Sequence, residues 1–176
     1  MAFDPVRNVD NFQQKGARMT KDAFQALVAD LTASLQGLPL DDSLAQRLNR
    51  EHPPGSGTYD AFFRACREGV AAGWMCEREA GGIRYGRVIK AGPETHGFSV
   101  DVVMMNDVKG PHHSHPNGEI DLVMPLDPAA RFDGQGAGWK VYGPGTAHHP
   151  TVTGGAAYVL YLLPAGAIQF TGAGSK

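Results

Sequence analysis

The stretch that decides the fold reads Gly110-Pro111-His112-His113-Ser114-His115-Pro116-Asn117-Gly118-Glu119-Ile120-Asp121, and Gly143-Pro144-Gly145-Thr146-Ala147-His148-His149-Pro150 follows it downstream. Five of the seven histidines in the chain lie in these two segments. Three imidazoles and a carboxylate make a ligand set that suits a borderline divalent metal ion. The clustering therefore indicates a metal site built from two separate parts of the chain.

Strand geometry explains how the first segment can supply several ligands. His113 and His115 are two residues apart, so both imidazoles point to the same side of an extended segment. The Pro-Asn-Gly that follows is turn chemistry, and a bend there brings Glu119 back beside them. His148 would arrive from a separate strand. A register shift of one residue would put the neighbouring histidine of each segment in its place.

Composition and charge narrow the class of protein. The chain has 176 residues, of which 42% are apolar, which predicts one domain with a buried core. A net charge of −2 without a long basic run argues against nucleic acid as a partner. No apolar run approaches the ~20 residues of a membrane span, and the N-terminus has no apolar signal core, so we expect a cytoplasmic protein. With only two cysteines, a disulfide is possible but not required.

Three regions are expected along the chain. Residues 1–19 are polar without apolar periodicity, which predicts an irregular extension. Residues 20–73 contain three segments with apolar residues at helical spacing, which predicts a helical N-terminal region. Residues 74–176 contain roughly eight short β-like runs separated by Gly, Pro and Asp, which indicates a β-sandwich or barrel. The first two runs, Trp74 to Glu79 and Ile83 to Lys90, flank the hairpin turn Ala80-Gly81-Gly82, and Asp133-Gly134-Gln135-Gly136 is a turn between two later runs. The candidate helix caps are Thr20, Asp41 or Asp42, and Ser56 or Thr58.

The two histidine segments resemble the motifs of the cupin superfamily. The first cupin motif centres on His-x-His, three or four residues, and Glu, and the second contains Gly-x-x-His, which Gly145 and His148 match. The resemblance implies a mainly β fold, a cupin-like jelly-roll barrel preceded by a helical segment. It also implies a divalent metal, which could be Fe, Mn, Ni, Co or Zn. The implied metal ligands are His113, His115, Glu119 and His148.

Three scaffold positions depart from the cupin pattern. Asp107 stands where the first motif has Gly, Gly143 where the second has Pro, and Val152 where the second has Asn. These departures leave the ligand core intact but shift the residues around it. The competing interpretation is a set of surface histidines or a polar network without metal.

A longer resemblance covers about residues 20–170. The run Cys76-Glu77-Arg78-Glu79-Ala80-Gly81-Gly82-Ile83-Arg84-Tyr85-Gly86-Arg87-Val88, with the two histidine segments, is similar to the 4-hydroxylaminobenzoate lyase family of nitroaromatic breakdown. This resemblance implies conversion of 4-hydroxylaminobenzoate to 3,4-dihydroxybenzoate and ammonia, with the metal as a Lewis acid. The implied catalytic residues are Glu119, Asp121, His112 and His149, the last three as groups that move protons.

A substrate with a ring carboxylate needs a cation, for which the planar fork of an arginine is best suited. Arg84 and Arg87 have opposite strand parity, so at most one of them faces the barrel, and Arg131 is a third candidate. Each of these arginines could equally be a surface charge, and each aromatic residue could be plain core. The aromatic candidates for a substrate pocket are Tyr85, Phe98, Trp139 and Tyr142.

Two other classes of function remain open from the sequence. The chain could be another metal-dependent cupin enzyme, such as an aromatic-ring oxygenase or an isomerase. It could also be a non-enzymatic cupin that binds a small ligand, although no helix has the basic character of a DNA-recognition helix. The apolar helix faces need a partner surface, either one side of the β-domain or a second copy of the chain. We therefore expect a homodimer.

Overall fold

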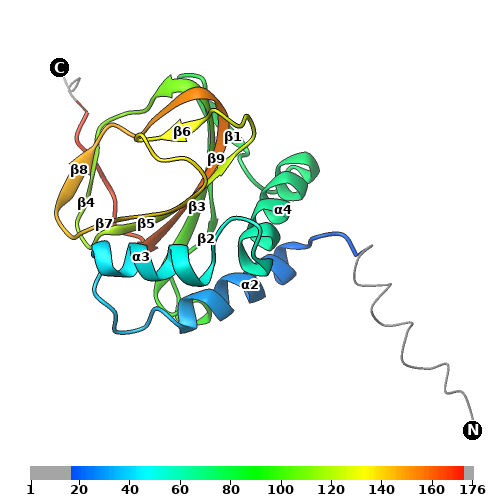
Figure 1. The fold of residues 1–176 in the computed structure, drawn as a ribbon, viewed down its shortest axis with the longest axis vertical. Coiled ribbons are helices and arrows are strands. Elements are labelled where there is room, and N and C mark those ends of the chain that lie inside the picture. Colours follow the sequence, from blue (N-terminus) through cyan, green and yellow to red (C-terminus); the bar gives the residue numbers. More distant parts are fainter. Residues whose placement is uncertain (1–16, 173–176) are drawn as a thin grey trace, which may run out of the picture.

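The computed structural model describes residues 17–172, so most of the predicted extension lies outside the described residues. Within that range three α-helices precede ten strands, and a short 3-10 helix, Pro93–Thr95, lies between the second and third strands (Figure 1). The prediction of a mainly β fold with an N-terminal helical segment is confirmed. The helices are α2, Lys21–Ala33; α3, Asp42–Glu51; and α4, Gly57–Ala72.

Each helix begins at one of the predicted caps. The side chains of Thr20, Asp41 and Ser56 accept hydrogen bonds from backbone N–H groups in the first turns of α2, α3 and α4. Gly73 ends α4 in the left-handed conformation, with φ of 83°, where glycine has no side chain to clash. Short polar residues and glycine therefore set the limits of the helical segment.

Seven strands form a large antiparallel sheet with the order β1-β2-β3-β9-β5-β7, and β6 pairs with β9. Gly81 and Gly82 make the predicted hairpin turn between β1 and β2. The first strand begins at Arg78 instead of Trp74, because Cys76 has φ of 54°, which breaks the extended conformation. The strands are β1, Arg78–Ala80; β2, Ile83–Ile89; β3, Phe98–Lys109; β5, Glu119–Pro125; β6, Arg131–Phe132; β7, Gly138–Tyr142; and β9, Thr151–Pro164.

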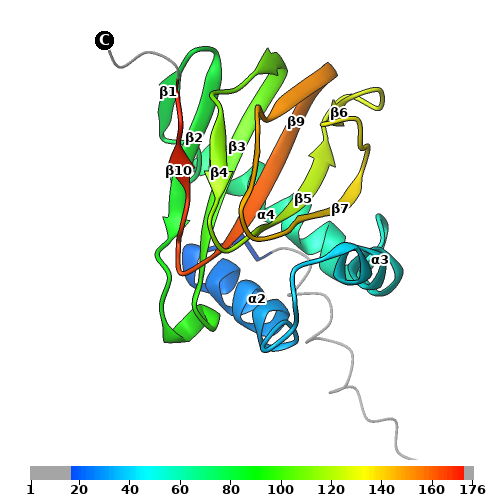
Figure 2. The same cartoon turned by 90° about the vertical axis from the view of Figure 1, so that its left-hand side faces the viewer.

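A second sheet of three short strands, in the order β10-β4-β8, faces the large one (Figure 2). Its pairing places His113 opposite His148 and His115 opposite Thr146. The predicted jelly-roll barrel thus takes the form of two facing sheets, which share no strand pairing in the part of the chain that the structure describes. The strands are β4, His113–His115; β8, Thr146–His148; and β10, Gln169–Phe170.

The two faces of the large sheet belong to different cores. On the outer face Leu122, Leu160 and Trp139 are cross-strand neighbours and pack with the helices. On the inner face Val123 and Val159 belong to a second cluster, between the sheets. The helices therefore cover one side of the β-domain, as one of the two sequence interpretations proposed. Because this packing already buries their apolar faces, it removes one reason for expecting a homodimer, which stays a prediction.

Two further expectations concern compartment. None of the helices described is both long and apolar enough to cross a bilayer. Cys66 and Cys76 are buried free thiols, so the optional disulfide is not formed. The cytoplasmic location stays a prediction.

Candidate metal centre

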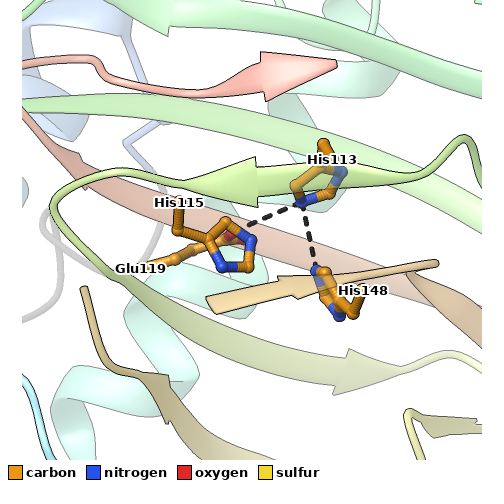
Figure 3. A group of neighbouring side chains, drawn as sticks. All are labelled: His113, His115, Glu119 and His148. Carbon is orange, nitrogen blue, oxygen red and sulfur yellow. Dashed lines mark hydrogen bonds and ion pairs between the residues drawn. The ribbon is translucent and has the colours of Figure 1, made fainter. Parts of the chain in front are cut away.

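Four side chains from three strands converge between the two sheets (Figure 3). His113 and His115 lie on β4, Glu119 opens β5, and His148 lies on β8. One ligand atom from each lies within 4.8 Å of the others. The alternation of β4 turns both of its imidazoles inward, and the pairing of β4 with β8 adds the third. The structure therefore brings together the four residues that the sequence predicted as metal ligands.

The turn before Glu119 depends on glycine. Gly118 has φ of 85°, and its N–H donates to the carbonyl of His115 at 3.2 Å. A Cβ at this position would lie 2.7 Å from the carbonyl oxygen of Tyr142 and 2.8 Å from a methyl carbon of Leu40. Only a residue without a side chain fits there, so Gly118 is what returns the chain toward the imidazoles.

The nitrogen and oxygen atoms that face one another have little access to solvent. The Nε2 atoms of His113 and His148 are 3.1 Å apart, and His113 Nε2 is 3.5 Å from Glu119 Oε2. His115 Nε2 also contacts Glu119 Oε2. Burial raises the pKa of Glu119, but hydrogen bonds with His113 and His115 outweigh it and hold the pKa below its usual range. Glu119 is therefore an anion in a buried site.

The other ring nitrogens show which tautomers are present. His148 Nδ1 donates to Asp133 Oδ2 at 2.6 Å. The Thr146 hydroxyl donates to the carbonyl of Gly143 at 2.7 Å, so its oxygen accepts the His115 Nδ1–H at 3.0 Å. When the ring is neutral, Nε2 of His115 and of His148 then carries a lone pair directed at the group; at His115 a proton on that nitrogen is what it donates to Glu119. Converging lone pairs and a carboxylate with fixed outer partners are a donor set that fits a divalent metal ion.

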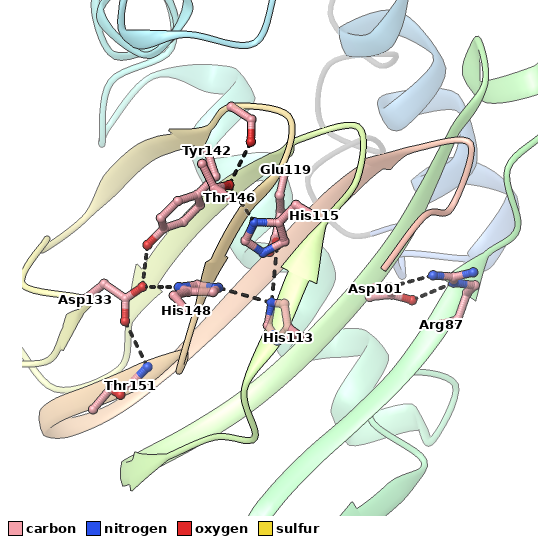
Figure 4. A network of polar contacts seen from close by, with 11 residues as sticks. Arg87, Asp101, His113, His115, Glu119, Asp133, Tyr142, Thr146, His148 and Thr151 are labelled. Carbon is pink, nitrogen blue, oxygen red and sulfur yellow. Dashed lines mark hydrogen bonds and ion pairs between the residues drawn. The ribbon is translucent and has the colours of Figure 1, made fainter. Parts of the chain in front are cut away.

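Asp133 and Thr146 were missed as site residues by the sequence analysis. The sequence predicts a turn at Asp133-Gly134, and the structure has one there. Asp and Gly are common turn residues, so the turn alone explains why they occur at these two positions. Burial raises the pKa of Asp133, but hydrogen bonds from His148, Tyr142 and Thr151 outweigh that effect, so the pKa lies below its usual range. Figure 4 shows this network of polar contacts around the histidines. No sequence signal we know distinguishes a turn aspartate that also contacts a ligand.

Asp121 lies on the same face of β5 as Glu119, two residues further along. Its carboxyl group is fully buried and has no hydrogen-bond partner among the described residues. Burial, and then the nearby charge of Glu119, raises its pKa well above the usual range. The sequence prediction that Asp121 belongs near the ligands is consistent with this position, and its role in proton transfer stays a prediction.

His112 and His149 lie outside the group of four. Their rings pack against each other with centroids 4.8 Å apart. His149 Nδ1 donates to the carbonyl of Gly110 at 3.2 Å, and His112 Nδ1 contacts the Thr171 hydroxyl. The alternative ligand register is therefore not the one the structure adopts.

A cavity of about 760 Å³ lies beside the group and includes His113 in its wall. It is lined from β2, β3, β9 and β10 and extends to the segment before β1. Two candidates for substrate binding, Tyr85 and Arg87, line it, together with Tyr161 and Phe170. The ring of Phe170 lies 5.7 Å from that of His113 and is 65% exposed. The cavity therefore offers aromatic walls next to the candidate metal ligands.

The other predicted binding residues lie elsewhere. Trp139 and Phe98 belong to the core on the helix side, and Trp139 Nε1 donates to the carbonyl of His52. Arg84 also faces that side, since its cross-strand partner is Met104, and Arg131 is exposed on β6. The structure does not bring these four residues to the cavity.

Tyr142 occupies a different place from the cavity residues. Its ring centroid lies 4.5 Å from that of His148 and 5.2 Å from that of His115. Its hydroxyl donates to Asp133. Tyr142 therefore packs against the candidate ligands themselves.

Arg87 enters the cavity already paired. Its Nε and Nη2 donate to the two carboxylate oxygens of Asp101 at 2.8 and 3.0 Å, and Nη2 also reaches the carbonyl of Gly166. This hydrogen bonding raises the pKa of Arg87. Its side chain is 36% exposed, and its place on the inner face of the large sheet follows from a row of cross-strand partners: Arg87, Asp101, Tyr161, Asp121 and Lys140. The parity argument, by which at most one of Arg84 and Arg87 faces inward, is confirmed.

Comparisons with known proteins place the chain in a family. The PnbB model, described as 4-hydroxylaminobenzoate lyase, matches residues 26–170. A 4-hydroxylaminobenzoate lyase of Pseudomonas putida is 34% identical over 167 residues, covering 85% of this chain and 95% of that protein. A second, from Nocardioides sp. (strain LMS-CY), is 37% identical over 138 residues, covering 73% of this chain and 82% of that protein.

Solved cupin structures resemble part of the chain. An oxalate oxidase in complex with glycolate has a TM-score of 0.41 and 21% identity, over 53% of this chain and 57% of that one. An RmlC-like cupin from Ralstonia eutropha has a TM-score of 0.38 and 13% identity, over 48% of this chain and 57% of that one. The sequence matches cover most of the described residues, and by them the chain belongs to the 4-hydroxylaminobenzoate lyase family.

Proposed function

We propose that this chain is a metal-dependent lyase that converts 4-hydroxylaminobenzoate and water to 3,4-dihydroxybenzoate and ammonia. The observation that carries the proposal is the buried convergence of three imidazoles and Glu119 at the wall of an aromatic-lined cavity. Membership of the lyase family supports the reaction and the substrate. The site would serve a small aromatic acid because the cavity lies directly beside the candidate ligands.

His113, His115, Glu119 and His148 would hold the metal, which is Fe, Mn, Ni, Co or Zn. When bound, such an ion supplies Lewis acidity in a site with little water. Glu119 contributes the negative charge, and the imidazoles present Nε2 because their other nitrogens are engaged at His115 and His148. The protein's part is therefore to hold four donors in one orientation before substrate arrives.

Arg87 is our proposal for the group that binds the substrate carboxylate. It is the candidate arginine that lines the cavity, and its Nη1 makes no hydrogen bond with the described residues. Asp101 would keep the guanidinium plane fixed while Nη1 donates to the ligand. Tyr85, Tyr161 and Phe170 would enclose the ring between this arginine and the metal ligands.

For proton transfer we propose Asp121 in preference to His112 and His149. Asp121 lies on the interior face of β5, two residues from Glu119, whereas the two histidines pack against each other outside the ligand group. A group that moves a proton must come within hydrogen-bond reach of the reacting atoms, directly or through one water molecule. Position alone favours Asp121.

The test is metal analysis of untagged protein together with ammonia release from 4-hydroxylaminobenzoate on the same sample. We expect stoichiometric metal, turnover that a chelator abolishes, and recovery when metal is added back. Bound metal without turnover would contradict the proposed substrate. Turnover that survives complete removal of metal would contradict the metal's role and leave the acids and bases of the site as the catalytic groups.

A further inference from the structure

Asp133 occupies a two-residue turn that aims its side chain at a candidate ligand. Phe132 and Gln135 exchange backbone hydrogen bonds of 2.8 and 2.9 Å, and Asp133 and Gly134 between them have φ of 46° and 83°. Positive φ at both central residues is the geometry of a type I′ turn, which Asp-Gly adopts readily. The local sequence therefore fixes the direction in which this carboxylate leaves the backbone (Figure 4).

The carboxylate is held on both oxygens. Oδ2 accepts hydrogen bonds from His148 Nδ1 at 2.6 Å and from the Tyr142 hydroxyl. Oδ1 accepts the backbone N–H of Thr151 at 2.9 Å, and the Asp133 N–H donates to the Thr151 carbonyl. Three donors from different elements leave this side chain little freedom to rotate. A fixed carboxylate in turn fixes the imidazole that donates to it.

His148 is the ligand that most needs such support. Its side chain is 12% exposed, against 2% for His113 and 0% for His115. Its outer nitrogen is the one among the described ligands that meets a charged acceptor. His115 donates to a hydroxyl, and His113 Nδ1 has no partner in the described part of the chain.

We propose that Asp133 is a positioning residue for the metal ligand His148, fixing the orientation of its ring and placing the lone pair on Nε2. The inference rests on the proposed metal site. A carboxylate that accepts the outer N–H of a ligating histidine orients the ring and makes it a better donor, and its loss typically weakens metal affinity 10–100-fold. Tyr142 acts on the same carboxylate by holding Oδ2 in place.

Asp133→Asn is the matched change, because Asn tolerates positive φ as Asp does and keeps the turn. Its amide can present an acceptor to Thr151 or to His148 but not two equivalent oxygens to both. Asp107→Asn is the control. Asp107 also has positive φ, 44°, and its carboxylate accepts the backbone N–H of Gly154 at 2.7 Å, yet it makes no hydrogen bond to an imidazole among the described residues.

The measurement is Zn²⁺ affinity of the demetallated full chain, by competition with a chromophoric chelator, with melting temperature recorded in parallel. We expect Asp133→Asn to weaken Zn²⁺ binding about 10–100-fold and Asp107→Asn to leave it unchanged. Equal affinities for wild type and Asp133→Asn would overturn the role of Asp133 while leaving the metal site intact. Failure of the wild type itself to bind Zn²⁺, Fe²⁺ or Mn²⁺ would overturn both.

Tyr142→Phe keeps the test decisive if Asp133→Asn does not fold. It removes one donor to the carboxylate and leaves the Asp133–His148 hydrogen bond in place. We expect a smaller loss of Zn²⁺ affinity and a changed ligand-field absorption in the Co²⁺-loaded protein, since the imidazole is less firmly oriented. Affinity and Co²⁺ spectrum identical to those of the wild type would count against the proposal.

Discussion

In each of two pairs of adjacent histidines, His112-His113 and His148-His149, the two members lie in different environments. One member of each pair joins the candidate metal ligands, and the other packs against its counterpart outside that group. The residue type is the same in all four places. What differs is position: His113 and His148 are cross-strand partners at the paired ends of β4 and β8, whereas His112 and His149 are the next residues beyond those ends. The point at which the strand pairing ends therefore decides which histidine of each pair joins the candidate ligands.

The candidate ligands and the His112–His149 pair differ in the hydrogen-bond acceptors that their Nδ1 atoms contact. Inside, His148 Nδ1 donates to a carboxylate that is itself held by two other donors. Outside, His149 Nδ1 donates to the backbone carbonyl of Gly110 at 3.2 Å. A charged, fixed acceptor strengthens the ring as a metal donor more than a neutral carbonyl does. His148 is therefore positioned to bind a metal ion, and His149 is not.

The largest effect is expected from His148→Ala compared with His149→Ala. Removing His148 deletes one metal donor and one of the two hydrogen bonds that Asp133 Oδ2 accepts. We expect metal affinity to fall by more than the roughly 10–100-fold that loss of an outer partner costs. His149→Ala should leave affinity and ammonia release near the wild-type level. Metal content after dialysis and chelator competition measure both.

Removing the metal should distinguish His148 from His149 by its effect on the melting temperature. A ligand that binds only the folded chain stabilises it by about 2.7 kcal/mol at a free concentration of 100 Kd. Chelation should therefore lower the melting temperature of the wild type and of His149→Ala alike, and leave that of His148→Ala almost unchanged. A drop of equal size in all three proteins would show that the stabilising ion binds elsewhere.

Patterns of period two predicted much of the interior. His113, His115 and the opposite parity of Arg84 and Arg87 follow from alternation alone, and the helix caps follow from short polar side chains. The side on which Trp139 lies could not be found this way. Alternation puts Trp139 and Val141 on one face of β7 and Lys140 and Tyr142 on the other, but it does not say which face the helices cover. Sequence identifies such residues as buried without saying in which core.

A third prediction contrasts Arg87 with Arg84, which lie three residues apart on β2 and face opposite sides. Arg87→Met should lower kcat/KM for 4-hydroxylaminobenzoate about 10–100-fold, as expected for loss of a charge-assisted hydrogen bond worth about 1.5–3 kcal/mol. Arg84→Met should change it little, since Arg84 reaches only the carbonyl of Cys76 within the described residues. The measurement is steady-state kinetics with the acid and with phenylhydroxylamine, which has no carboxylate. If both substrates suffer equally from Arg87→Met, the arginine supports the cavity instead of binding the carboxylate.

The smallest effect on activity is expected from Trp139→Phe, set against Tyr85→Leu on the other face of the large sheet. Trp139 is 1% exposed in the core on the helix side, and its indole N–H donates to the carbonyl of His52 at 2.9 Å. The change removes that donor and part of a ring, so we expect a loss of about 1–3 kcal/mol in the free energy of unfolding, measured in urea, with KM unchanged. Tyr85→Leu should raise KM and leave the free energy of unfolding nearly unchanged, because the Tyr85 side chain lines the cavity. A raised KM for Trp139→Phe at unaltered stability would return the tryptophan to the substrate pocket that its sequence position suggested, and would mean that the helix face takes part in binding.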